Sequence, residues 1–217
     1  LTCCTRDDAS AVILWDAVSH RPTFTESNDN GVTSVAMSAD GVMYAFGDSQ
    51  GKVVVGKVET PGEDLRTFQV GGAGISALNF APNGEMLAAG CDDTTIYVLK
   101  LTEDDAADPL TFGGHTASVN HLDWTEDSTF LRSNSADYEL LFWNVESGEH
   151  VTASEDISAI GEFATHHCPL TFETLGIWPS IADGTHINAC DASKTLGVVA
   201  STNDYGRVRL YKYPATQ

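Results

Sequence analysis

The sequence predicts an all-β fold built from small sheets that repeat along the chain. Short runs rich in Val, Ile, Leu and aromatic residues recur, and Gly, Asn and Asp separate them. Residues 34–38 and 121–125 show a period-two alternation, which is typical of a strand with one buried face. The same order of strands and polar turns returns several times, so we expect one repeated unit.

The last predicted strand of each unit gives the spacing of the repeats. These strands read AVILWD (11–16), KVVVGK (52–57), TIYVLK (95–100), ELLFWN (139–144) and RVRLYK (207–212). Steps of 41, 43, 44 and 68 residues separate Trp15, Gly56, Leu99, Trp143 and Tyr211 within them. A step of about 40–45 residues with four strands per unit is typical of WD40 repeats, which form the blades of a β-propeller.

Two polar turns precede these strands in each repeat. The first turns read SADG (38–41), APNG (81–84), TEDS (125–128) and DASK (191–194). The second turns read DSQG (48–51), CDDT (91–94), ADYE (136–139) and NDYG (203–206). Asp, Asn, Ser and Gly favour such positions because their side chains bond the local backbone or permit unusual dihedral angles.

We therefore predict an incomplete WD40 β-propeller over residues 1–217, with about four full blades and part of a fifth. The predicted repeats cover residues 1–18 (partial), 19–59, 60–101, 110–145 and 146–213. The chain opens on a strand-like run, LTCCTR, without an initiator Met or a signal peptide. We expect it to be part of a longer chain.

The last repeat contains an insertion at about residues 160–183, within and ahead of the run HHCPLTFETLGIWPSIADGTHINAC (166–190). Residues 185–190 occupy the place of an innermost strand, so the insertion should lie between the outer strand of one blade and the inner strand of the next. Its apolar residues, which are too apolar for a solvated loop, are Phe172, Leu175, Ile177 and Trp178. They either fill a gap between blades or domains, or form a partner-binding surface.

The charge of the chain excludes some partners. It has 31 Asp and Glu against 11 Lys and Arg, giving a net charge of −20. Nucleic acids and anionic membranes need clustered basic residues, so we expect neither as a partner. No apolar run approaches the ~20 residues that span a bilayer.

The cysteines and histidines predict no metal or cofactor. Five cysteines without a C-x-x-C pair suit a reducing compartment such as the cytoplasm, where they serve as small core residues. Cys168, His166 and His167 have the chemistry of zinc ligands, but a fourth ligand at metal spacing is missing.

The repeat at 110–145 contains the residues of a WD40 structural tetrad, in which a His, a Ser, an Asp and a Trp are hydrogen-bonded. The matching residues are His115, Ser133, Asp137 and Trp143. The same His, Ser and Asp could be read as a catalytic triad. A hydrolase would need an exposed nucleophile beside an oxyanion hole, and no G-x-S-x-G, P-loop or G-x-G-x-x-G after a strand is present, so we predict that the chain is not an enzyme.

Several motifs together resemble one family. HLDWTEDSTFLRSNSADYELLFWN (121–144), LGIWPSIADGTHINA (175–189) and GRVRLYKYP (206–214) occur in this order. They are similar to the H-L-D-W, S-N-S-x-D-Y-E, W-P with D-G-T-x-I-N, and aromatic-Y-P motifs of the echinoderm microtubule-associated protein-like family. The resemblance covers essentially the whole chain and is strongest over 114–214.

The resemblance implies a piece of the second of two tandem propellers, in a non-enzymatic scaffold that binds tubulin. It implies a location on microtubules in the cytoplasm, with the axonemal doublets of cilia as a further setting. Partners would be tubulin and the other blades of the same parent chain. The alternative is a WD40 adaptor that holds another protein without touching tubulin.

Tubulin is itself acidic, so a chain of net charge −20 needs a surface that avoids repulsion. Two surfaces are candidates for partner binding. One is the apolar insertion with Phe172, Ile177 and Trp178, and the other is the basic strand with Arg207, Arg209 and Lys212.

Overall fold

The computed structural model describes residues 2–6, 9–102, 108–179 and 186–216. Parts of the predicted repeats, namely residues 1, 7–8 and 180–185, lie outside the described residues. Among the described residues, no helix combines the length and the apolar character that crossing a bilayer requires.

The described residues form five antiparallel sheets that follow one another in chain order. The first contains β1 (Thr2–Arg6), β2 (Ala9–Asp16) and β3 (Arg21–Asn28). The second contains β4 (Val32–Met37), β5 (Met43–Asp48), β6 (Lys52–Lys57) and β7 (Arg66–Gln69). The third contains β8 (Ile75–Phe80), β9 (Met86–Cys91), β10 (Thr95–Lys100) and β11 (Leu110–Gly113). The fourth contains β12 (Val119–Trp124), β13 (Phe130–Ser135), β14 (Leu140–Asn144) and β15 (Glu149–Val151), and the fifth contains β16 (Ile187–Ser193), β17 (Val198–Asn203) and β18 (Val208–Lys212).

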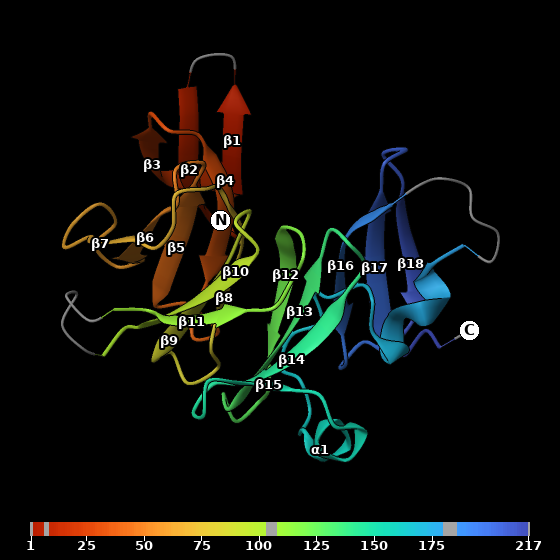
Figure 1. Ribbon diagram of the computed structural model, residues 1–217. Coiled ribbons are helices and arrows are strands. Elements are labelled where there is room, and N and C mark those ends of the chain that lie inside the picture. Colours follow the sequence, from red (N-terminus) through yellow and green to blue (C-terminus); the bar gives the residue numbers. More distant parts are fainter. Residues whose placement is uncertain (1, 7–8, 103–107, 180–185, 217) are drawn as a thin grey trace.

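The sheets lie around an arc, with the first and the fifth at its two ends (Figure 1). All-β sheets in this arrangement confirm the predicted propeller architecture. In the described part of the chain, three four-stranded sheets stand between two three-stranded ones, whereas the predicted repeats give four full units and a partial one. The reason is that a sequence repeat straddles two sheets: β3 falls in the predicted repeat 19–59 but pairs with β2 of the first sheet.

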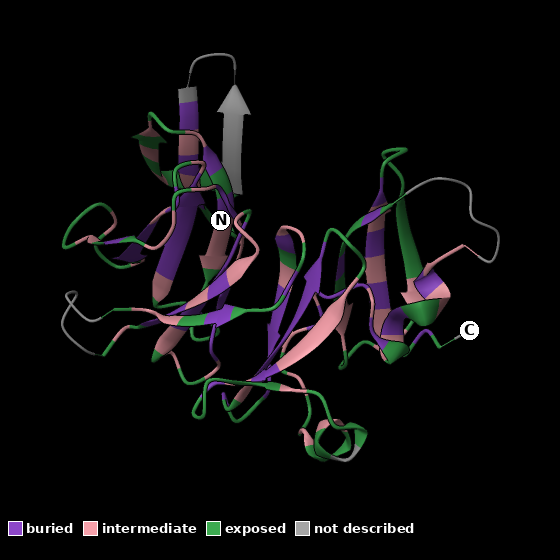
Figure 2. Ribbon diagram, in the orientation of Figure 1, coloured by how far each residue is buried: buried purple, intermediate pink, exposed green. Residues whose placement is uncertain are grey.

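Apolar clusters join the first four sheets pairwise. Both faces of a middle sheet are buried, which explains why β6 and β10 read as nearly continuous apolar runs. Figure 2 shows buried residues along the strands of the middle sheets. Representative members of the three clusters are Val12 and Tyr44, Val55 and Leu87, and Val98 and Trp143. Each fully buried aliphatic side chain of this kind contributes about 1.5–3 kcal/mol relative to exposure.

Candidate interaction surface

The insertion lies between β15 and β16, and its first part runs along β12. After the short helix α1 (Ser154–Ala159), Phe163 forms an antiparallel bridge with Thr125. The backbone N–H of Ala164 donates to the carbonyl of Trp124 (2.8 Å) at the end of β12. The helical turn η1 (Phe172–Ile177) follows and leads towards β16. We refer to residues 162–179 as the wedge.

A buried ion pair holds the wedge against the fourth sheet. Asp123 on β12 has no solvent exposure and Arg132 on β13 is 3% exposed. Arg132 Nε donates to Asp123 Oδ2 (2.9 Å), and the other carboxylate oxygen, Oδ1, accepts from the backbone N–H of His167 (2.7 Å). Thr165 Oγ1 (2.8 Å, to Oδ1) and the N–H of Cys168 (3.1 Å, to Oδ2) complete the bonds to this carboxylate.

The electrostatics of this ion pair favour the charged form of the acid. Burial by itself would raise the pKa of Asp123, but the Arg132 guanidinium, His167 and the hydrogen bonds from the wedge outweigh it, so its pKa is lowered. The carboxylate therefore stays ionised. It accepts hydrogen bonds from backbone N–H groups of the wedge, which lie more than forty positions away in the sequence.

The wedge also supplies the apolar contacts between the last two sheets. Phe163 lies against Phe142 of β14, with ring centres 6.3 Å apart, and the Arg132 guanidinium lies over the Phe163 ring at 4.0 Å from its centre. On the side of the fifth sheet, Ile177 belongs to a buried cluster with Val199 of β17. At the other interfaces the sheets provide both halves of the cluster, whereas here inserted residues stand between them.

The predicted partner-binding residues of the insertion separate into two groups. Ile177 is 1% exposed, so the structure places it in the core and it cannot meet a partner. Phe172 is 71% exposed. Trp178 is half-buried, and its Nε1 donates to the carbonyl of Pro169 (2.9 Å). Of the apolar residues in this stretch, Ile177 is buried and Trp178 is half-buried, whereas Phe172 and Leu175 are exposed, because the turn geometry of η1 decides which side chains face the core.

The basic strand β18 is the outer strand of the fifth sheet in the described part of the chain. Arg207, Arg209 and Lys212 are all exposed there. The neighbouring Val208 and Leu210 are also exposed, although the ladders align them with Ile96 and Val98 of β10, which are buried under the fourth sheet. This strand therefore has the apolar positions of a blade-to-blade contact.

The structure brings together three of the four expected tetrad residues. Trp143 Nε1 donates to Ser133 Oγ (2.8 Å), and Ser133 Oγ lies 2.6 Å from His115 Nε2. The acid at His115 Nδ1 is Glu139 (3.0 Å), whereas Asp137 accepts a hydrogen bond from Thr116 Oγ1 (2.5 Å). The assignment of Asp137 to the tetrad is therefore corrected to Glu139, which stands two positions later at the start of β14.

Burial is the largest influence on the histidine of this network. It lowers the pKa of His115, although the Glu139 carboxylate opposes it. A neutral imidazole can accept from Ser133 at Nε2 and donate to Glu139 at Nδ1, so each polar atom has a partner. Ser133 itself has no solvent exposure, which leaves no path for a substrate to its hydroxyl group.

Replacing Glu139 by alanine should destabilise the propeller by about 1–2 kcal/mol, because the buried His115 loses its Nδ1 partner. The matched change Asp137→Ala removes a surface contact to Thr116 and should have a smaller effect. Urea unfolding, monitored by Trp fluorescence, measures the stability of both variants. A larger loss for Asp137→Ala than for Glu139→Ala would restore Asp137 to the network.

The cluster of His166, His167 and Cys168 has a structural explanation. His166 Nδ1 accepts from Arg132 Nη2 (3.1 Å), and burial followed by the Arg132 charge lowers the pKa of His166. Burial holds the pKa of the Cys168 thiol well above its ordinary value. Within the described ranges, no group of three or more His, Cys, Asp or Glu residues is arranged to hold a metal ion.

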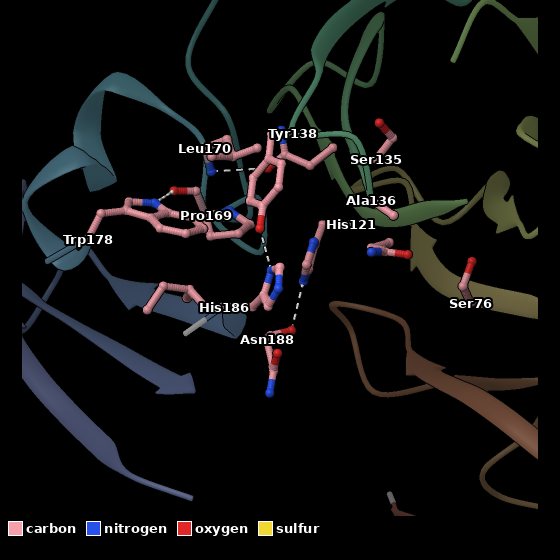
Figure 3. Close-up of a pocket in the computed structure, with 13 residues that line it drawn as sticks. Ser76, His121, Ser135, Ala136, Tyr138, Pro169, Leu170, Trp178, His186 and Asn188 are labelled. Carbon is pink, nitrogen blue, oxygen red and sulfur yellow. Dashed lines mark hydrogen bonds between the residues drawn. The ribbon is translucent and has the colours of Figure 1, made fainter. Parts of the chain in front are cut away.

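Two grooves lie at the wedge, where it meets the neighbouring sheets. The aromatic groove, about 390 Å³, lies beside the β13–β14 turn and the start of β16, and its walls include His121, Tyr138, Trp178, His186 and Asn188 (Figure 3). The charged groove, about 720 Å³, lies between β14, α1 and η1, and its walls include Arg132, Glu162, Phe172, Glu173 and Lys194.

Sequence reasoning missed Tyr138 and His186, although a signal for the first was present. The ladders align Tyr138 with Gly51, Thr94 and Gly206 in the matching turns, and all four residues adopt a positive φ. Glycine occupies two of these turns because it adopts a positive φ without steric cost, so a bulky tyrosine is unusual at this position. His186 gave no comparable signal, because its ring meets Tyr138 only through the fold.

Repeated antiparallel sheets around an arc, with a Trp–Ser–His–Glu network inside one blade, define this chain as a WD40-type β-propeller segment. All 217 residues match a family described as "Echinoderm microtubule-associated protein second beta-propeller". The chain belongs to this family, which confirms the resemblance seen in its motifs.

Curated relatives show the same relationship. "Echinoderm microtubule-associated protein-like 1" of Mus musculus is 36% identical over 208 residues, which are 94% of this chain and 25% of the relative. "Echinoderm microtubule-associated protein-like 2" of Rattus norvegicus is 33% identical, covering 95% of this chain and 32% of the relative. The "77 kDa echinoderm microtubule-associated protein" of Strongylocentrotus purpuratus is 34% identical, covering 94% of this chain and 30% of the relative. The chain thus spans about a quarter to a third of these relatives' length.

Proposed function

We propose that the protein is a non-enzymatic microtubule-associated scaffold and that this propeller segment contributes to its contact with tubulin. The observation that carries the proposal is the match of the whole chain to the second propeller of a microtubule-associated family. The names of the relatives describe them as microtubule-associated proteins or as similar to them. Their location on the cytoskeleton is proposed for this protein on the same ground.

The absence of an enzymatic role is part of the proposal, and the tetrad supports it. Its Ser133 would be the nucleophile of a triad, but it is buried and already bonded by both Trp143 and His115. A serine hydrolase needs a nucleophile that a substrate carbonyl can reach. The network instead ties two strands to the loop that precedes β12, which is a structural role.

The charge of the chain favours a second candidate, a propeller adaptor without tubulin contact. A net charge of −20 slows association with an acidic partner such as tubulin. In the scaffold proposal, this repulsion must be overcome at a surface without acidic side chains or by other parts of the full-length protein.

Co-sedimentation of the full-length protein with stabilised microtubules separates the two candidates. The scaffold proposal expects the protein to pellet with microtubules in a saturable manner and to remain in the supernatant without them. A tagged copy in cells should then lie along microtubules, either cytoplasmic or axonemal. If the full-length protein stays in the supernatant at every microtubule concentration, the adaptor function replaces this proposal.

A further inference from the structure

We infer that the aromatic groove between the fourth and fifth sheets is the surface of this propeller that receives the microtubule. This inference rests on the proposed function, which leaves open which part of the chain makes the contact. The inference favours the aromatic groove over the basic strand β18 and over the charged groove. It names Tyr138 as the main contact residue.

Residues from three parts of the chain form the groove (Figure 3). Tyr138 comes from the turn before β14, Trp178 from the end of the wedge, and His186 from the residue that precedes β16. The Tyr138 ring stacks on His186 with centres 5.7 Å apart and an interplanar angle of 15°, and it meets Trp178 edge-on at 6.2 Å. The Tyr138 hydroxyl bonds to His186 Nδ1.

Hydrogen bonds that join the fifth sheet and the wedge to the fourth sheet fix the base of the groove. His121 Nε2 on β12 donates to the carbonyl of Asn188 on β16 (3.1 Å), and the N–H of Leu170 donates to Asn134 Oδ1 (3.1 Å). The aromatic side chains are therefore held in place before a partner arrives. Such preorganisation reduces the entropy that binding would otherwise lose.

Tyr138 keeps an unfavourable backbone conformation. Its φ is 62°, in the left-handed region that bulky residues avoid, and the matching turns of the other sheets contain Gly51 (φ 78°), Thr94 (φ 73°) and Gly206 (φ 67°). The stack on His186 gives the Tyr138 ring one contact that favours tyrosine at this position. The rest of the side chain is not covered, because Tyr138 remains 52% exposed beside the groove. An exposed, rigidly held tyrosine is a residue type that dominates the energy of protein interfaces.

The charge distribution identifies the kind of partner. Among the described residues that line the aromatic groove, none is an Asp, Glu, Lys or Arg. The charged groove includes Glu162 and Glu173, and its cations Arg132 and Lys194 are already paired with Asp123 and Glu162, so an acidic partner there would bring carboxylates together. A tubulin surface, which is acidic, can approach the aromatic groove without burying a pair of like charges.

Two acidic residues stand near the rim of the groove, and both are already hydrogen-bonded. Asp137 accepts from Thr116, and Asp204 accepts from the N–H of His186 (2.8 Å). Charges at a rim affect the association rate more than the final affinity.

The basic strand β18 is the weaker candidate, because Val208 and Leu210 stand at positions that are blade-to-blade contacts in the third sheet.

The experiment uses the full-length protein and microtubule co-sedimentation. Tyr138→Gly suits the positive φ and removes the ring, so it should fold and should weaken binding about tenfold or more. Tyr138→Phe keeps the ring and should stay within about twofold of the wild type. Arg207→Glu with Arg209→Glu should also bind as the wild type does, and raised salt should have little effect.

A second variant does not depend on Tyr138. Asn120 is exposed and lines the groove, so Asn120→Glu places a negative charge in it and should weaken binding about tenfold. Thr67→Glu makes a comparable charge change at an exposed position of β7 and serves as the control. Circular dichroism of each variant excludes unfolding as the cause.

The outcomes distinguish this inference from the proposed function. If the wild type does not pellet, the proposed function fails. If the wild type pellets and both Tyr138→Gly and Asn120→Glu pellet equally well, the function stands and the groove is not the contact. Loss of binding in the Arg207→Glu, Arg209→Glu variant alone would assign the contact to β18 and overturn the inference.

Discussion

Replacing Asp123 by alanine is expected to destabilise the propeller by about 3–5 kcal/mol, because the buried Arg132 guanidinium would lose its buried counter-charge and keep only the longer contact (3.7 Å) to the exposed Glu173 carboxylate. The same change removes the acceptor for Thr165 Oγ1 and for the backbone N–H groups of His167 and Cys168. Both the fourth sheet and the wedge should therefore loosen together. Hydrogen exchange in the intact protein should show lost protection over residues 119–135 and 162–170.

The control for this change is an ion pair at the surface. Lys194 Nζ lies 3.4 Å from Glu126 Oε1, and both side chains are substantially exposed. Glu126→Ala should change stability little, since exposed ion pairs contribute little. Similar exchange rates in Asp123→Ala and Glu126→Ala would show that the buried ion pair does not hold the wedge.

The ion pair also has a pH dependence of definite sign. The folded-state pKa of Asp123 lies below its ordinary value of 3.8. The contribution of Asp123 to the free energy of unfolding is therefore complete above that value. It is lost as the pH falls through the lower folded-state pKa. Unfolding measured between neutral pH and pH 2 should show this acid loss in the wild type, and the loss should be smaller in Asp123→Ala.

Ile177→Ala should cost about 2–5 kcal/mol, because it leaves a cavity between the wedge and the fifth sheet. The side chain is 1% exposed and packs in the cluster with Ile187, Cys190 and Val199. Phe172→Ala is the matched control within the same helical turn. Its ring is exposed, so its removal should change stability by less than about 0.5 kcal/mol.

Thermal unfolding and exchange of β16 and β17 in the intact protein measure the two variants. The expected result is a lower melting temperature and faster exchange at residues 187–203 for Ile177→Ala alone. Equal effects of the two substitutions would mean that the apolar side of η1 is not the side that the structure buries, and Ile177 would return to the surface candidates.

Much of the fold could be predicted because its signals are local. Strands such as β6 and β10 are apolar over their full length, and polar turns at regular steps separate them. The spacing also located the insertion, since one step between equivalent residues is far longer than the others. Family motifs within 114–214 then predicted the class of protein, and the match of the whole chain bears this out.

The candidate site was predictable only in part. Residue types identified His115, Ser133 and Trp143, whose bonds the structure shows, but Asp137 and Glu139 are both acids in one turn. Which of them reaches His115 depends on the direction that the backbone takes at Tyr138, where φ is positive. Residue type alone therefore did not decide between the two acids.

The sequence by itself determined the repeated all-β architecture and the family, because both depend on nearby residues or on their spacing. The tertiary structure alone decided that the insertion becomes a wedge, with Ile177 inside and Phe172 outside. It also brought Asp123 to the N–H of His167, and Tyr138 to His186. These contacts join residues more than forty positions apart, and they form only when packing of the sheets fixes the distance between them.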